Sequence, residues 1–215
     1  MNRPVSKLTV GAIRIAPMTE AALDAVVEIH LAAFPDYMNA SLGRGYLRAF
    51  LRGFLSRSDA VALMAMSESG QVLGYAAGAP VQAVPEMTRA LASTAALALM
   101  VRPWLFTSPR IRRTVRQTAA QWLGRSARPK ATPLLPMPTY SLVSIGVDPH
   151  ARGRGVGDQL LKAFEQEAVQ RGGVAMRLSV YPSNHGARQF YERHGWQPFV
   201  EEVPPGEAMY YSKVF

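Results

Sequence analysis

A short glycine-rich turn, Arg152-Gly153-Arg154-Gly155-Val156-Gly157, is the feature that most constrains the fold of this chain. Residues 140–147 before it alternate in polarity and are rich in β-forming side chains, which predicts a strand. After the turn, apolar side chains recur at helical spacing, at Leu160, Leu161, Phe164 and Ala168. They predict a helix that ends at Arg171-Gly172-Gly173. The order is therefore strand, glycine-rich turn, helix.

Such a turn suits the binding of a diphosphate. Glycines allow left-handed backbone conformations, and the free N–H groups of a helix start point outward with the positive end of the helix dipole. Arg152 and Arg154 add positive charge beside them. Taken alone, the residues also allow a tight strand-to-helix turn with solvated arginines. A P-loop is excluded because no Gly-Lys-Ser/Thr follows the turn. A Rossmann fingerprint is excluded because the glycine spacing is Gly-x-Gly-x-Gly and because residues 174–181 contain no carboxylate.

Two blocks of sequence carry a resemblance to a known family. The motif Arg152-x-x-Gly155-x-Gly157, after a strand ending in Val147-Asp148-Pro149, resembles the coenzyme A pyrophosphate loop of the GNAT family of N-acetyltransferases. Residues 184–196, with Asn184 before a helix that carries Phe190-Tyr191 and is closed by Gly195-Trp196, resemble the later motif of that family. The resemblance covers about the last 75 residues closely. It implies an α/β fold with a mixed, splayed central sheet of the acyl-CoA N-acyltransferase type.

The resemblance also implies roles for individual residues. Backbone groups at Ile145, Gly146 and Val147 would contact the pantetheine arm of acetyl-CoA, the implied co-substrate, and Asn184 would hydrogen-bond the coenzyme near that arm. Tyr191 would be the general acid, because a phenol with a pKa near 10 is protonated at neutral pH and can protonate the departing thiolate. Packing is the alternative for Tyr191, which shares one helix face with Ala187 and His194. The pyrophosphate loop would comprise Arg152, Gly153, Arg154, Gly155, Val156, Gly157 and Asp158.

A general base is harder to assign. Family members that acylate protein N-termini often place a Glu five residues before the Asn, but Ser179 stands at that position here. A water chain, or Glu28, His30 or Asp36 from the first helical region, would have to serve, and each of these three is expected to be a surface residue. We expect direct attack of the amine on the thioester, because the chain has no Cys and no serine lies in a nucleophile elbow. No metal site is expected, because the spacing of His150, His185 and His194 is not that of metal ligands.

The N-terminal part agrees with the family layout in general terms. A strand is expected at residues 8–15, a helix from the N-cap Thr19 to near Pro35, and a second helix through residues 46–54. Residues 61–66 and 71–77 predict a hairpin around Glu68-Ser69-Gly70. We expect a single domain over residues 1–215 with an inserted, mainly helical segment at about 81–138. Its helical pieces are predicted at residues 86–101 and 111–123.

The positive charge of the chain is concentrated in that insertion. Residues 88–147 contain no Asp or Glu but nine Arg and Lys residues, which equals the formal net charge of +9 of the whole chain. Three explanations are open: a solvated basic face, attraction of an anionic acceptor or of the coenzyme phosphates, and contact with a membrane surface. Nucleic acid is not expected as a partner, because aromatic residues do not interleave with the charge. Residues 1–7 are not typical of a signal peptide, so a cytoplasmic protein is expected.

These patterns predict an N-acetyltransferase that moves an acetyl group from coenzyme A to a primary amine of a small-molecule or peptide acceptor. Two alternatives remain at this stage. One is a non-catalytic, regulatory acyl-CoA-binding module, and the other is an acyltransferase that uses the basic insertion to associate with a membrane surface. The sequence does not specify the acceptor, the acyl chain length or the oligomeric state.

Overall fold

A computed structural model describes residues 12–35, 37–107, 112, 135–199 and 208–215, and these residues form a mixed α/β fold around one sheet. The strand order in the sheet is β1-β2-β3-β4-β5-β7-β6. All neighbouring strands are antiparallel except β4 and β5, which are parallel. The strands are β1 Arg14–Pro17, β2 Val61–Met66, β3 Val72–Pro80, β4 Thr139–Val147, β5 Ala175–Val180, β6 Gln197–Pro198 and β7 Met209–Val214.

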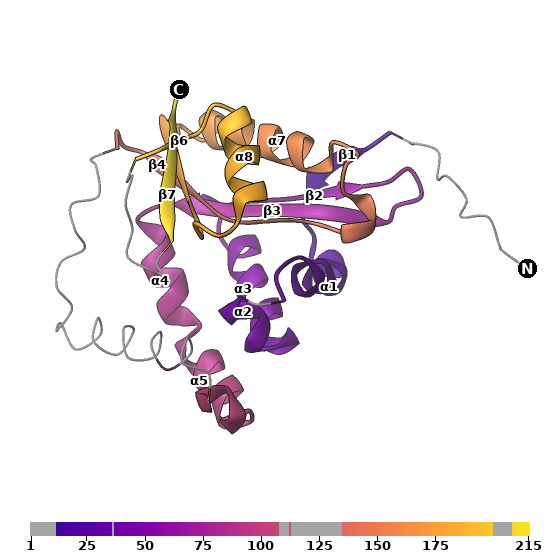
Figure 1. The fold of residues 1–215 in the computed structure, drawn as a ribbon, viewed down its shortest axis with the longest axis vertical. Coiled ribbons are helices and arrows are strands. Elements are labelled where there is room, and N and C mark those ends of the chain that lie inside the picture. The colour runs from indigo at the N-terminus through magenta and orange to yellow at the C-terminus, as the bar shows by residue number, and fades with distance from the viewer. Residues whose placement is uncertain (1–11, 36, 108–111, 113–134, 200–207) are drawn as a thin grey trace, which may run out of the picture.

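Helices cover both faces of the sheet (Figure 1). On one face lie α7 (Val156–Gln170) and α8 (His185–Arg193), where Phe164 and Trp196 are buried in the larger apolar core. On the other face lie the short 3-10 turn η1 (Glu20–Ala22), α1 (Leu23–Ala33), α2 (Met38–Ser41) and α3 (Arg44–Leu55). Leu23 and Leu47 are fully buried there in a second core. The sheet is therefore the middle of three layers.

Most of the expected elements are confirmed. The hairpin of β2 and β3 turns at Gly70, which has a φ of +83°, and the strand, turn and helix around Gly155 are present as expected. The first strand is shifted, since β1 runs from Arg14 to Pro17, and residues 8–11 of the expected strand lie outside the described part. Thr19 stands at the start of η1 as expected, but its side chain makes no capping hydrogen bond.

The insertion differs from the expectation of one helix over residues 86–101. Helix α4 (Ala83–Ala90) starts earlier and ends before Leu91, where α5 (Ala92–Met100) begins in a new direction. Pro85 is tolerated because it lies in the first turn of α4, where its missing N–H would have no helical partner. A 3-10 turn, η2 (Pro103–Thr107), follows α5. The helix expected at residues 111–123 lies outside the described residues except for Arg112.

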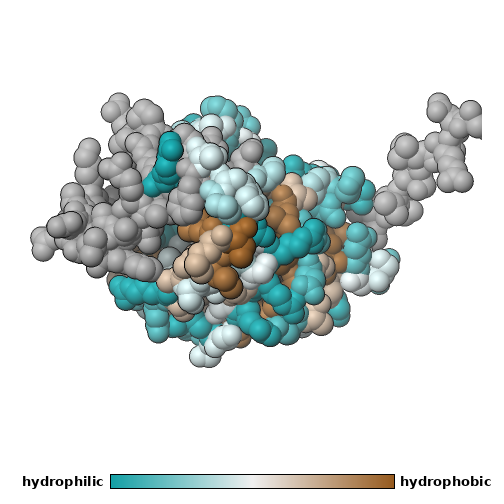
Figure 2. All heavy atoms as spheres, turned by 90° about the horizontal axis from the view of Figure 1, so that it is seen from below, coloured by the Kyte–Doolittle hydropathy of each residue, from teal (hydrophilic) through white to brown (hydrophobic). Residues whose placement is uncertain are grey.

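Helix α5 extends away from the sheet and has one buried and one exposed side. Ala98 packs with Leu42 and Tyr46 from the α2–α3 region. Figure 2 shows an apolar patch on the surface at the end of the molecule where α5 lies. The exposed apolar side chains of α5 and the residues after it are Leu97, Met100, Val101 and Trp104. In the described part of the chain no helix is long and apolar enough to cross a membrane.

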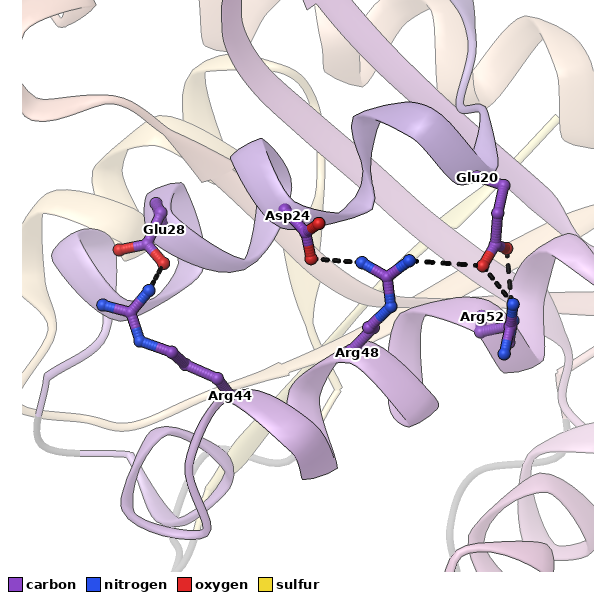
Figure 3. Close-up of polar contacts among 6 residues, drawn as sticks. All are labelled: Glu20, Asp24, Glu28, Arg44, Arg48 and Arg52. Atoms are coloured by element: carbon purple, nitrogen blue, oxygen red, sulfur yellow. Dashed lines mark hydrogen bonds and ion pairs between the residues drawn. The ribbon is translucent and has the colours of Figure 1, made fainter.

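Six charged residues join η1 and α1 to α3 along their exposed sides (Figure 3). Glu28 pairs with Arg44 and Asp24 pairs with Arg48, while Glu20 pairs with both Arg48 and Arg52. The acids and the arginines each recur every fourth residue, so two helical faces match. Because the pairs are exposed, each one contributes little to stability. They connect α3 to α1, which carries His30 of the candidate active site.

Candidate active site

The candidate site lies where β4 and β5 separate. These parallel strands are paired only between residues 139–141 and 175–177. A bulge next to Ser144 also interrupts the pairing of β3 with β4, whose partners shift between Ala77 and Gly78. Beyond Ser141 the edge of β4 that faces β5 is unpaired, so its backbone groups are free to bond a ligand. The splay of the sheet, expected from the family resemblance, therefore produces the opening in which the site lies.

The glycine-rich loop has the backbone that the sequence predicted. Gly153 and Gly155 have φ values of +74° and +75°, a region that other residues seldom adopt. Gly155 is the N-cap of α7, and the first helical hydrogen bond runs from the amide of Gln159 to the carbonyl oxygen of Gly155. The N–H groups before Gln159 therefore have no helical acceptor, and they form the positive end of the helix dipole. This is the arrangement that binds phosphate groups at helix starts.

A cavity of about 570 Å³, here called the loop cavity, lies against this helix start. Arg152 and Arg193 line it and supply positive charge, and Phe190 and Phe34 supply apolar surface. Arg154 lies in the loop but is exposed and does not line the cavity. Of the residues predicted from the sequence, the cavity brings together Ile145, Gly146, Val147, Arg152, Gly153, Gly155, Val156, Gly157, Asp158, Asn184 and Tyr191.

Asp158 is the one carboxylate among the described residues that line the loop cavity. Its Oδ1 atom lies 3.1 Å from Nε2 of His194, while Nδ1 of His194 lies 2.7 Å from the carbonyl oxygen of Phe190. The ring of His194 is therefore held between Asp158 in α7 and the backbone of α8, beside the loop cavity.

A second cavity of about 310 Å³, here called the strand cavity, lies between the splayed strands. Aromatic side chains form much of its wall, with Phe34 and Tyr37 in edge contact at a centroid distance of 5.1 Å, and Tyr37 and Tyr181 at 5.4 Å. Ser144 and Ser179 contribute hydroxyl groups. The two cavities share five lining residues, which are Phe34, Ile145, Asn184, Ala187 and Tyr191. The cavities therefore meet at these side chains.

Tyr191 has both a packing role and a position in the site. Its ring packs on Trp196 and Tyr211, with centroid distances of 6.0 and 6.3 Å, and only 8% of the residue is exposed. Burial raises the pKa of Tyr191 above its ordinary value, so the phenol is protonated at neutral pH. None of the described residues forms a hydrogen bond with its hydroxyl group, which leaves that proton available to a ligand. The packing alternative and the expected acid role are thus compatible.

Asn184 connects the site to the start of α8. Its Oδ1 atom accepts a hydrogen bond of 3.1 Å from the amide of Ala187 and thereby caps the helix. The side chain has its amide NH₂ group left as a donor, and Asn184 lines both cavities. A capping residue is held in one orientation by the helix. Asn184 can therefore present a fixed donor to a carbonyl group of a ligand.

The three residues expected as candidates for the general base differ in their surroundings. Glu28 is exposed and paired with Arg44, in line with a surface residue. The same expectation is wrong for His30, of which only 4% is exposed and which lines the strand cavity. The helical spacing of Leu23, Val26, Val27 and His30 places the histidine on the buried face of α1, and this pattern could have identified it. Asp36 lies outside the described residues.

Ser179, at the position where some relatives carry a Glu, is exposed and lines the strand cavity. The described residues that line this cavity include no carboxylate. The described parts of the chain also hold no group of three or more His, Asp or Glu residues placed to bind a metal ion. Sequence reasoning missed Phe34, Tyr37, Tyr181 and Arg193, because the first three come from segments brought together only by the fold and Arg193 resembles any exposed helical arginine.

Comparisons with known proteins agree with this geometry. A family model described as "Acetyltransferase (GNAT) family" matches residues 126–196. The uncharacterized N-acetyltransferase YhfO of Bacillus subtilis (strain 168) is 38% identical to this chain over 58 residues. That match covers 27% of this chain and 39% of YhfO, so the chain spans about two-fifths of the length of this relative. Residues 126–196 are thus similar to the GNAT acetyltransferase family, the family that the sequence motifs resemble.

Solved structures share the fold at low sequence identity. The PaiA N-acetyltransferase of Thermoplasma acidophilum, solved in complex with coenzyme A, has a TM-score of 0.57 and 12% identity, and the match covers 95% of this chain and 99% of that one. An N-acetyltransferase of Staphylococcus aureus Mu50 has a TM-score of 0.57 and 17% identity, with coverage of 95% and 99%. The splayed α/β sheet is thus the fold of these acetyltransferases, which confirms the expected fold class.

Proposed function

We propose that this protein transfers an acetyl group from acetyl-CoA to a primary amine. One observation carries the proposal most directly: Tyr191 lies where the loop cavity and the strand cavity meet. A thioester held along the loop cavity would then present its carbonyl carbon to an amine in the strand cavity. Holding both reactants in such a position supplies much of the rate by itself.

The loop cavity suits the coenzyme. The free amides before Gln159 and the guanidinium of Arg152 are the groups we propose for the pyrophosphate. The unpaired edge of β4 at Ile145, Gly146 and Val147 would bond the pantetheine arm, and the NH₂ group of Asn184 would donate to one of its carbonyl groups. The related fold of PaiA, which was solved with coenzyme A, supports acetyl-CoA as the co-substrate.

The proposed reaction is a direct transfer without an acyl-enzyme. The amine nitrogen bonds to the thioester carbon, the carbon–sulfur bond breaks, and the hydroxyl group of Tyr191 donates its proton to the departing sulfur. The nitrogen loses one proton, Tyr191 regains one from water, and the products are an amide and free coenzyme A. Residues 1–215 would form one catalytic domain, in which the insertion at about 81–138 flanks the acceptor side.

Release of free thiol from acetyl-CoA tests this function. The purified protein is incubated with acetyl-CoA and a panel of small-molecule and peptide amines, including acidic ones because of the acid-free stretch at residues 88–147. We expect thiol release that depends on one class of amine, with the acetylated product seen by mass spectrometry. Tight binding of acetyl-CoA without release for any amine would instead favour the non-catalytic acyl-CoA-binding module.

A second candidate function, acyl transfer at an anionic membrane surface, is favoured by the apolar patch of α5 (Figure 2). Met100 and Trp104 are 72% and 61% exposed, in a region of sequence that has no acidic residue from position 88 to 147. Apolar side chains beside positive charge are typical of membrane-surface contacts. Flotation with phosphatidylserine vesicles tests it: Met100→Ser with Trp104→Ser should abolish binding, and Val169→Ser, an exposed apolar site on α7, should not. Equal flotation of all three proteins, or of none, would reject this candidate.

A further inference from the structure

Three side chains from different elements form a continuous chain of hydrogen bonds beneath the strand cavity. Nδ1 of His30 in α1 lies 2.5 Å from the hydroxyl oxygen of Tyr75 in β3. The same hydroxyl oxygen lies 2.6 Å from Oγ of Ser144 in β4. These residues are separated by 45 and 69 positions in the sequence, so only the fold brings them together.

The chain of hydrogen bonds has a buried end and an open end. Tyr75 is fully buried, and His30 is almost so. Ser144 is only partly buried, and it lines the strand cavity together with His30. Burial lowers the pKa of His30 to about 4, so its imidazole is neutral at physiological pH. Burial also raises the pKa of Tyr75, so its phenol stays protonated.

The direction of the hydrogen bonds can reverse. Nε2 of His30 is buried, and no described residue forms a hydrogen bond with it. In a catalytic triad a carboxylate bonded to the second ring nitrogen fixes the tautomer, whereas no described group does so here. When Nδ1 is the acceptor, Tyr75 donates to His30 and Ser144 donates to Tyr75. The free lone pair of Ser144 Oγ then faces the strand cavity as a hydrogen-bond acceptor.

We propose that Ser144 takes the proton from the acceptor amine, and that Tyr75 and His30 form the relay that receives it. This proposal rests on the proposed acetyl transfer and adds the group that plays the role of the general base. It fits the strand cavity, whose described lining contains two of the three residues of this chain of hydrogen bonds, His30 and Ser144, and no carboxylate. Ser144 would touch the substrate, whereas Tyr75 and His30 act through it as positioning residues.

The proton balance of the step is complete. As the nitrogen bonds to the carbonyl carbon, its N–H becomes far more acidic than that of a free ammonium ion. That proton passes to Oγ of Ser144, the hydroxyl proton of Ser144 passes to the oxygen of Tyr75, and the phenolic proton passes to Nδ1 of His30. Ser144 and Tyr75 end as neutral hydroxyl groups, and His30 is an imidazolium only until the proton returns, because burial disfavours its charged form. The reverse shift returns the proton to the cavity after the amide leaves.

Single and double substitutions test the relay with the amine found in the thiol-release panel. Ser144→Ala and Tyr75→Phe should each lower kcat by about 10²-fold, while the affinity for coenzyme A measured by calorimetry stays unchanged. The double variant should lose no more than the worse single variant, because each change breaks the same relay. Ser144→Thr keeps the hydroxyl group and should recover most of the kcat lost in Ser144→Ala.

Matched controls separate this role from packing. Ser141→Ala makes the same change in the same strand outside both cavities, and Tyr140→Phe removes the hydroxyl group of another buried tyrosine. Both should retain the wild-type kcat.

Unchanged kcat in Ser144→Ala, or losses that multiply in the double variant, would overturn the relay and leave the acetyl transfer intact. If the wild-type protein released no thiol with any amine, the proposed function would fail and the relay with it. Should Tyr75→Phe fail to fold, the comparison of kcat in Ser144→Ala and Ser144→Thr decides whether the hydroxyl group at position 144 takes the proton.

Discussion

The indole nitrogen of Trp196 donates a hydrogen bond of 2.7 Å to Oε1 of Glu165, which joins the segment after α8 to the middle of α7. The other carboxylate oxygen, Oε2, accepts a hydrogen bond of 2.7 Å from Lys213 in β7. Trp196 is 1% exposed, and the side chain of Glu165 is 14% exposed, so these groups are largely shielded from water. One carboxylate thus ties together the helix that follows the loop, the C-terminal strand and the end of the later family motif.

Replacing Glu165 should therefore destabilise the fold. Glu165→Leu leaves a buried indole N–H without its acceptor and Lys213 without its counterion, and we expect a loss of about 2–4 kcal/mol in the free energy of unfolding. Urea denaturation measures it. Glu167→Leu is the matched control in the same helix, because Glu167 is more exposed and, among the described residues, pairs with Arg171 alone; its effect should stay within about 0.5 kcal/mol. Equal losses in the two variants would show that the link to Trp196 contributes nothing.

The glycine loop offers a second prediction. Gly155→Glu places a side chain and a negative charge at the start of α7, where the pyrophosphate is proposed to bind. Two unit charges 4 Å apart repel by about 4 kcal/mol at an effective dielectric constant near 20, so the affinity for coenzyme A should fall by more than about 10²-fold. Calorimetry on the folded variant gives the affinity.

Gly70→Glu is the control for that experiment. Gly70 also has a positive φ, of +83°, and its added Cβ would meet open space in the β2–β3 turn. The backbone cost and the added charge are thus matched, but the site is different. We expect Gly70→Glu to lose about as much stability as Gly155→Glu but to keep the wild-type affinity for coenzyme A. Near-normal affinity in folded Gly155→Glu would refute the assignment of the loop.

Tyr191 gives a third prediction. Tyr191→Phe keeps the ring contacts with Trp196 and Tyr211 but removes the proton proposed for the departing thiolate. We expect kcat to fall by about 10²–10⁴-fold with little change in coenzyme affinity. Tyr46→Phe, at a buried tyrosine in α3, should leave both quantities unchanged. Full activity in Tyr191→Phe would leave packing as its one role and indicate that water protonates the thiolate.

Local patterns were sufficient for the parts of the fold that depend on neighbours in sequence. The turn at Gly70 and the loop at Gly155 could be predicted because positive φ angles select glycine. At Gly155 the apolar periodicity also changes from two residues, in the strand, to 3.6, in the helix. The motif residues of the loop cavity followed from the same stretch and from the family resemblance. For these elements, sequence neighbours are also structural neighbours.

The remaining features depend on contacts between distant segments. Residues 83–100 contain no glycine, and their one proline lies in the first turn of α4, so the break at Leu91 has no signal in the local sequence. The packing of Ala98 against Leu42 and Tyr46 accompanies the new direction of α5. His30 was different: it was expected at the surface, but its place in the apolar stripe of α1 could have predicted its burial. The position of its hydrogen-bond partner Tyr75, by contrast, depends on how whole strands pair in the sheet, and the local sequence does not show this.

The burial of His30 predicts how stability depends on pH. The pKa of His30 is about 4 in the folded protein, against 6.5 for an exposed histidine, and the cause is burial. Between these values the unfolded chain binds a proton that the folded protein does not bind. Stability should therefore be fully present above about pH 6.5 and should decrease as the pH falls toward 4, by up to about 3 kcal/mol from this residue.

His30→Gln isolates this contribution, since glutamine does not titrate and every other ionisable group is retained. Free energies of unfolding measured by urea denaturation at several values between pH 7 and pH 4 should show a smaller slope in His30→Gln than in the wild-type protein, whatever the absolute stability of the variant. His30 contacts the hydroxyl of Tyr75 and the ring of Phe34, neither of which titrates in this range. Parallel curves for the two proteins would mean that His30 takes up its proton equally well in the folded state, and that it is not shielded from water in solution.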